Sequence, residues 1–199
     1  MKKELRAYSM VTRAEAATQT EQKIMNATVA LWMELPLNQI TLEKVAERAG
    51  VTVRTILRKF GSRDGLFDAC LQKDASNIEK KRNQANIGNI AEALDLLLAE
   101  YEEMGDAVIR TIALENELSG AKKLLDRGRA YHREWCARVF GPYLPAPGSD
   151  EYEIKLAALI AATEIYLWKL LRKDLQRSYS QTLQVFRLLV DGIIPNSHP

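Results

Sequence analysis

Apolar residues recur at steps of three and four along most of the 199-residue chain, and no sustained alternation of apolar and polar residues replaces that spacing. Steps of three and four place side chains on one face of a helix, whereas a half-buried strand needs strict alternation. No Asn-Gly or Asp-Gly pair lies between two apolar runs, where it would indicate a hairpin. The chain is therefore predicted to be all-α.

Stop and cap signals divide the chain into nine predicted helices. Pro36 ends the first helix, and Gly105-Asp106 is interpreted as the end of one helix and the cap of the next. Ser178 and Gln181 have the spacing of a capping box before the last helix. The predicted helices cover residues 20–35, 42–49, 53–59, 63–82, 89–104, 107–118, 121–140, 150–173 and 179–193.

Positive charge is concentrated at the front of the chain. Residues 1–63 hold eleven basic and six acidic side chains, whereas the remainder holds seventeen basic and twenty acidic ones. Residues 51–63 contain four basic residues and no acid. A basic front on a mildly acidic body indicates that an anionic polymer docks there. Charge alone does not separate this reading from an ordinary solvated face.

Several classes of protein are excluded by what the sequence lacks. No stretch approaches the roughly 20 apolar residues that span a bilayer, and no apolar segment follows the basic N-terminus. Two cysteines are too few for a disulfide scaffold, which favours the reducing cytoplasm. His132 has no Cys or carboxylate at ligand spacing, and no phosphate loop or nucleophile elbow is present. We therefore expect no membrane span, no metal, no cofactor and no enzymatic activity.

The most informative segment covers residues 41–60. Thr41 stands where it caps a first short helix, and Gly50 stands just past its end, where a left-handed backbone is needed. Thr52 then stands where it caps a second short helix. Two short helices joined by so tight a turn are typical of a helix-turn-helix.

The second helix of such a motif presents its N-terminal residues to the major groove of DNA. Arg54 is therefore placed for a bidentate contact to guanine, and Val53 and Thr55 for base edges or thymine methyls. The basic residues that follow are placed for phosphates. The candidate DNA-binding residues are Thr41, Thr52, Val53, Arg54, Thr55, Leu57, Arg58, Lys59 and Arg63.

This set of residues resembles the DNA-binding domain of the TetR family of one-component bacterial transcription regulators. The resemblance runs from Ile24 to Leu66. The matching residues are Ile24, Ala27, Leu31, Trp32, Thr41, Val45-Ala46, Ala49 to Thr52, Thr55-Ile56, Phe60 and Ser62-Arg63. It implies a three-helix DNA-binding domain at 20–62 and a ligand-binding and dimerisation domain at 63–199. Residues 1–19 form an N-terminal arm that is expected to be disordered, although its basic residues also suit a DNA groove.

The chain departs from the family pattern at several positions. Pro36 stands where the family usually has glycine, and Leu57 replaces a tyrosine that commonly contacts phosphate. Lys59 replaces a histidine or tyrosine, and Arg63 replaces a lysine. The resemblance thus implies that DNA binding is kept, with a site preference that relatives do not supply.

The resemblance also implies a homodimer on palindromic DNA, joined through the last two helices at residues 150–173 and 179–193. It further implies a small-molecule effector bound among the middle helices. The candidate pocket residues are Tyr101, Met104, Tyr131, Trp135, Phe140, Glu164 and Trp168. Aromatic residues at helical spacing are also ordinary core, and Glu164, an acid in an apolar run, needs either a structural cation or a basic ligand.

The sequence therefore favours a DNA-binding transcriptional regulator of the cytoplasm, a repressor that a small-molecule effector releases from an inverted-repeat operator. The alternative is an all-helical protein-interaction module that has lost specific DNA binding.

Overall fold

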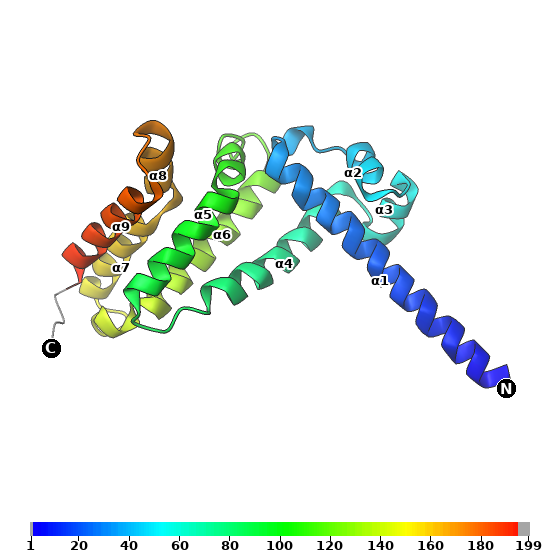
Figure 1. Cartoon of the computed structure of the whole chain (residues 1–199), viewed down its shortest axis with the longest axis horizontal. Helices are drawn as coiled ribbons and strands as arrows, with labels where there is room; N and C mark the ends of the chain where they lie inside the picture. The colour runs from blue at the N-terminus through cyan, green and yellow to red at the C-terminus, as the bar shows by residue number, and fades with distance from the viewer. Residues whose placement is uncertain (1, 195–199) are drawn as a thin grey trace. The chain divides into compact units, whose positions relative to one another are not determined.

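A computed structural model describes the backbone of residues 2–194 and the side chains of residues 15–73 and 80–194. This part of the chain contains nine α-helices and no strand, so the predicted all-α class is confirmed (Figure 1). The helices are α1 (Lys2–Glu34), α2 (Leu42–Ala49), α3 (Val53–Phe60), α4 (Arg63–Arg82), α5 (Ile90–Ile112), α6 (Ser119–Val139), α7 (Asp150–Thr163), α8 (Ile165–Lys169) and α9 (Tyr179–Ile193).

The chain divides into two compact units, Met1–Ala75 and Ser76–Pro199, which we call the head and the body. The boundary falls inside α4, because the first part of that helix packs in the head and its last turns pack in the body. The sequence-based boundary after residue 62 assigned the whole of α4 to the second domain.

The first helix is much longer than predicted, because α1 begins at Lys2 and not at Thr20. Residues 2–19, expected to form a disordered arm, are thus helical. The reason is local: no glycine or proline occurs before Pro36, so nothing in the sequence ends a helix there. The side chains of residues 15–19 are exposed, so they carry no apolar stripe from which a helix could be recognised. The arm's basic residues, at positions 2–13, lie outside the described side chains.

The predicted break at Gly105-Asp106 is wrong, since α5 continues through it to Ile112. Gly105 is a packing residue and not a helix end: a Cβ atom built there would lie 2.5 Å from the Trp168 ring. The absence of a side chain at Gly105 lets the indole lie directly on the α5 backbone. Sequence spacing could not distinguish a glycine that ends a helix from one that admits a neighbour.

The prediction of one helix over residues 150–173 is also wrong, because here the structure divides a predicted helix instead of joining two. It breaks at Glu164, whose backbone is extended at φ −77° and ψ 152°. The Glu164 side chain caps α8, because its Oε2 atom accepts the Ile165 amide at 3.1 Å. A wide π turn, Leu170–Asp174, then leads toward α9. One merged helix and one divided helix leave the total at nine.

The body has a single apolar core at the centre of α5, α6, α7 and α9. These helices contribute large side chains at helical spacing, and the burial of such residues is the main stabilising term of the fold. The most fully buried include Leu94, Leu97, Leu98, Trp135, Phe140, Leu156, Leu159, Phe186 and Val190.

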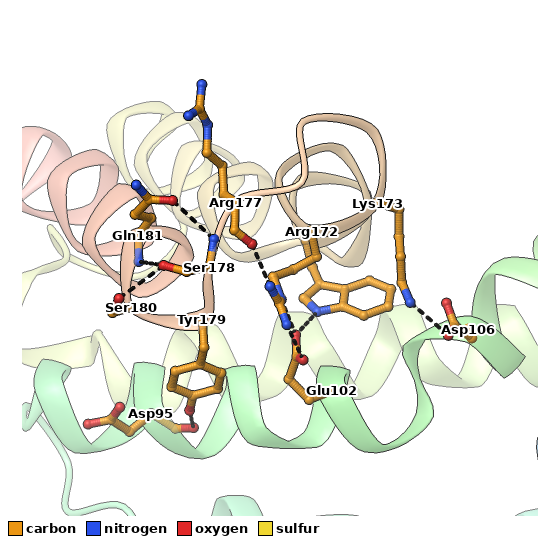
Figure 2. A network of polar contacts seen from close by, with 11 residues as sticks. Asp95, Glu102, Asp106, Arg172, Lys173, Arg177, Ser178, Tyr179, Ser180 and Gln181 are labelled. Carbon is orange, nitrogen blue, oxygen red and sulfur yellow. Dashed lines mark hydrogen bonds and ion pairs between the residues drawn. The ribbon is translucent and has the colours of Figure 1, made fainter.

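A polar network fastens the corner between α8 and α9 to α5 (Figure 2). Glu102 accepts Trp168 Nε1 at 2.7 Å and both Nε and Nη2 of Arg172, at 2.7 and 2.8 Å. The hydrogen bonds from Arg172 lower the pKa of Glu102. Lys173 pairs with Asp106 at 2.8 Å one turn further along α5. The start of α9 therefore has a defined place on the body. None of the described helices has the length and apolar character that a bilayer crossing requires.

Candidate nucleic-acid interface

The tight turn between α2 and α3 has the geometry that its sequence predicts. Thr41 Oγ1 accepts the Lys44 amide at 3.3 Å and caps α2. Gly50 has φ +65° and ψ 39°, the left-handed conformation that a side chain would strain. Thr52 Oγ1 accepts the Thr55 amide at 3.2 Å and caps α3. Both predicted caps and the predicted left-handed glycine are confirmed.

Packing in the head determines which face of α3 is left free. Ile56 is completely buried, and Phe60, one turn later, is half-buried. Residues of α1, α2 and the start of α4 are also buried in the head. They are Ile24, Ala27, Leu31, Val45, Ala46 and Leu66. The opposite side of α3 faces solvent.

Lys59, predicted to contact phosphate, is turned back onto α1. Its Nζ atom donates to the Ala17 carbonyl at 2.7 Å and lies 3.6 Å from Glu21 Oε2. Only 16% of its side chain is exposed. Lys59 therefore joins α3 to the long first helix, and the structure gives it a partner other than DNA.

Arg63, the other predicted phosphate ligand at the end of the motif, also has partners within the head. Its Nε and Nη2 atoms donate to the carbonyls of Ile40 and Leu37, at 2.8 and 2.6 Å. Its guanidinium lies 4.7 Å from the centre of the Phe67 ring. Arg63 thus fixes the start of α4 to the segment before α2.

Arg54 and Arg58 differ from these two residues. Both are exposed, and neither makes a hydrogen bond or an ion pair with the described part of the chain. Residues four apart share one face of a helix, so the two guanidiniums point to the same side of α3. Leu57 lies on that side and is 42% exposed. We call Arg54, Leu57 and Arg58 the reading face.

The other candidates on α3 are less available. Val53 and Thr55 are half-buried, and the Thr55 hydroxyl lies 3.0 Å from that of Thr52. Thr41 and Thr52 are exposed and use their hydroxyl oxygens as caps. The sequence predicted the helix and its caps but could not separate side chains with partners inside the head from free ones.

In the body, the predicted pocket residues belong to the core or line its edge. Tyr101, Trp135, Phe140 and Trp168 are buried, while Met104, Tyr131 and Glu164 are half-buried. The rings pack on one another, with Trp135 and Phe140 edge-on at 5.8 Å and Tyr101 and Trp168 tilted at 6.4 Å. Trp168 also lies on Gly105, and its Nε1 donates to Glu102.

Sequence analysis missed a buried polar cluster beside these rings. Arg82, the last residue of α4, donates to both carboxylate oxygens of Glu100 at 2.7 Å. Burial disfavours the charge on Arg82, but the carboxylate outweighs it and raises the pKa of the guanidinium. The sequence held one signal, because Glu100 occupies a position within the apolar stripe of α5.

His132 extends the cluster to α6 and α7. Arg82 Nη1 lies 3.1 Å from His132 Nδ1, and because an arginine only donates, Nδ1 must accept. The proton is then on Nε2, which donates to Thr163 Oγ1 at 3.0 Å. Burial, together with the nearby charge of Arg82, lowers the pKa of His132 to about 3. His132 is therefore neutral and links the end of α4 to the end of α7.

Glu164 forms no ion pair with any described residue, so the structural cation, one of its two expected partners, is not found there. Its carboxylate accepts the Ile165 amide instead, and burial raises its pKa. The helix break explains this outcome, since an extended residue before α8 is placed to cap that helix.

A capped helix pair with a free cationic face is typical of a helix-turn-helix DNA-binding protein. Residues 24–70 match the family described as bacterial regulatory proteins, tetR family. No curated protein is similar enough in sequence to match. Solved structures share the fold. A transcriptional regulator from Rhodococcus sp. Rha1 has a TM-score of 0.68 and 15% identity, over 87% of this chain and 95% of that one.

NalD of Pseudomonas aeruginosa, the secondary repressor of the MexAB-OprM multidrug efflux pump, is another such structure. It has a TM-score of 0.59 and 17% identity, over 92% of this chain and all of that one. The tetR-family match thus covers residues 24–70 of the head, and the solved structures share the all-helical fold of the whole chain.

Proposed function

We propose that this protein is a transcriptional repressor that binds an inverted-repeat operator as a homodimer and is released by a small-molecule effector. The observation that carries this proposal is the reading face, where two exposed guanidiniums have no partner in the described chain. Exposed arginines on the second helix of a helix-turn-helix are placed for guanine edges and phosphates. The repressor role is supported by the likeness to NalD, which is named as a repressor. Chromosomal DNA as the target favours a cytoplasmic location.

The homodimer is supported by apolar surface on α7 and α9. Ile154 on α7 is 72% exposed, and Ala157 and Ala161 lie on the same face at steps of three and four. Leu188 on α9 is 73% exposed. Phe186, on the same helix, is buried in the body's own core. The small residues of α7 allow the helices of a second copy to approach closely.

The effector is supported by the surroundings of Glu164. Its half-buried carboxylate lies at the break between α7 and α8, and it forms no ion pair with a described residue. Burial raises its pKa, although the charges of Arg129 and Arg82 act to lower it. A basic molecule would supply a cation in direct contact with this carboxylate. Such a molecule would act on α7, whose last residue, Thr163, is joined through His132 to the end of α4.

Selection of bound duplexes from a random pool tests this function. We expect an enriched inverted repeat, with a footprint on that repeat that weakens when cell metabolite extract is added. If binding is tight but no repeat is enriched, the protein-interaction module is the better description. A footprint that the extract leaves unchanged would remove the effector from the proposal.

Arg54→Ala is expected to weaken binding to the selected operator by about 1–3 kcal/mol and to relax one base position in each half-site. The reason is the loss of a bidentate contact to guanine. Repeating the selection with the variant measures both effects. An unchanged base preference would contradict the assignment of Arg54.

Arg58→Ala is expected to weaken binding to all duplexes alike and to lower the slope of log K against log salt by roughly one unit for each half-site. Lys59→Ala is the matched control, one residue away with the same charge change. Because Lys59 already binds Ala17 and lies near Glu21, we expect it to change the slope less. Titrations at several salt concentrations compare the two variants. Equal slopes for the two variants would show that the Lys59 side chain releases its partners on α1 and contacts phosphate when DNA binds.

A further inference from the structure

Leu57 is the one large apolar side chain of the head that is exposed among the described side chains. A single exposed leucine is common on protein surfaces and is not by itself a site. Its position is what sets it apart, because Arg54 precedes it by three residues and Arg58 follows it directly. Both arginines are exposed and unpaired, so Leu57 lies within the surface that meets DNA.

The core of the head does not require Leu57. Ile56 is completely buried, and Phe60 is the half-buried residue of the next turn. The leucine therefore keeps its exposed surface until a partner covers it. Phosphate oxygens are an unfavourable partner, because a hydrocarbon offers them no hydrogen bond in place of water.

We propose that Leu57 is a specificity-determining residue that packs on the C5-methyl group of a thymine in the major groove. This inference rests on the proposed function and names a feature of the operator. The thymine methyl is the one methyl group that the four bases present in the major groove. Against other base edges, leucine would cover nitrogen and oxygen atoms without replacing their hydrogen bonds to water. Leu57 thus favours thymine and disfavours the other bases at that position.

The helix sets how far this thymine lies from the guanine that Arg54 contacts. Three residues advance an α-helix by about 4.5 Å, and base pairs are about 3.4 Å apart along the duplex. The thymine is therefore expected one or two base pairs from that guanine in each half-site.

Deoxyuridine tests the contact, because uracil lacks the methyl group and keeps the hydrogen-bonding groups of thymine. Each thymine of the selected operator is replaced in turn, symmetrically in both half-sites, and the dissociation constant is measured at fixed salt. For the unmodified protein, we expect one position at which the replacement weakens binding by about fourfold per half-site, as loss of one buried methyl predicts. Leu57→Ala should bind the thymine and uracil duplexes equally well at that position.

Arg58→Ala is the control, since it should weaken binding to both duplexes while preserving their ratio. Leu57→Ala removes exposed atoms, so its thermal unfolding should match that of the unmodified protein. If no thymine is sensitive, or if Leu57→Ala keeps the same sensitivity, the assignment of Leu57 is wrong although the protein reads DNA. If no duplex is bound at all, the proposed function fails together with this inference.

Discussion

Glu100→Ala is expected to destabilise the protein by about 3–5 kcal/mol, because it leaves the charge of Arg82 buried without its partner. Arg82 is 4% exposed and Glu100 is 8% exposed, so water cannot replace the lost carboxylate. Urea unfolding of the variant and the unmodified protein measures the difference.

The chain offers a matched control for this prediction in the neighbouring pair Lys81–Glu103. The two residues are separated by 2.8 Å and also join α4 to α5, but both are largely exposed. Glu103→Ala should therefore cost no more than about 1 kcal/mol. The double variant Arg82→Met with Glu100→Leu removes both charges and should cost less than Glu100→Ala alone. Similar losses for Glu100→Ala and Glu103→Ala would show that the buried pair has no special role.

Leu188→Asp is expected to lower affinity for the full operator by about 10²–10⁴-fold, because it places a charge in the proposed dimer face and removes the second head. Binding to a duplex with a single half-site should stay unchanged, since α9 lies outside the head. Sedimentation of the protein gives its mass in solution, and titration of the two duplexes gives the two affinities.

Ile87→Asp is the comparison for that experiment, because Ile87 is 61% exposed but belongs to neither α7 nor α9. It should leave both the mass in solution and the operator affinity unchanged. A Leu188→Asp protein that remains dimeric and binds the full operator normally would place the dimer contact on another surface.

Local rules predicted the parts of the fold that depend on neighbouring residues. Thr41, Gly50, Thr52 and Ser178 all have the roles that their spacing indicates, because a cap is satisfied within three residues. The all-α class follows from the same periodicity. These features need no knowledge of which helices meet.

The features that sequence analysis missed depend on residues far apart in the chain. Gly105 resembles a helix end until Trp168 is known to lie on it, 63 positions later. Lys59 resembles a phosphate ligand until α1 is known to pass beside it. Glu100 is an acid without a visible partner in the apolar stripe of α5 until Arg82 is known to reach it from α4. In each case the chemistry of the residue was evident, and its partner was not.

The small number of side chains proposed to read bases has a consequence for how one promoter is distinguished from the rest of the chromosome. Arg54 and Leu57 on one short helix distinguish only a short base sequence, and such a sequence occurs by chance at many places in a chromosome. Two copies of the chain bound to the two half-sites of an inverted repeat require this base sequence twice, at a fixed spacing. Recognition of one promoter would then depend as much on α7 and α9, the proposed dimer surface of the body, as on α3.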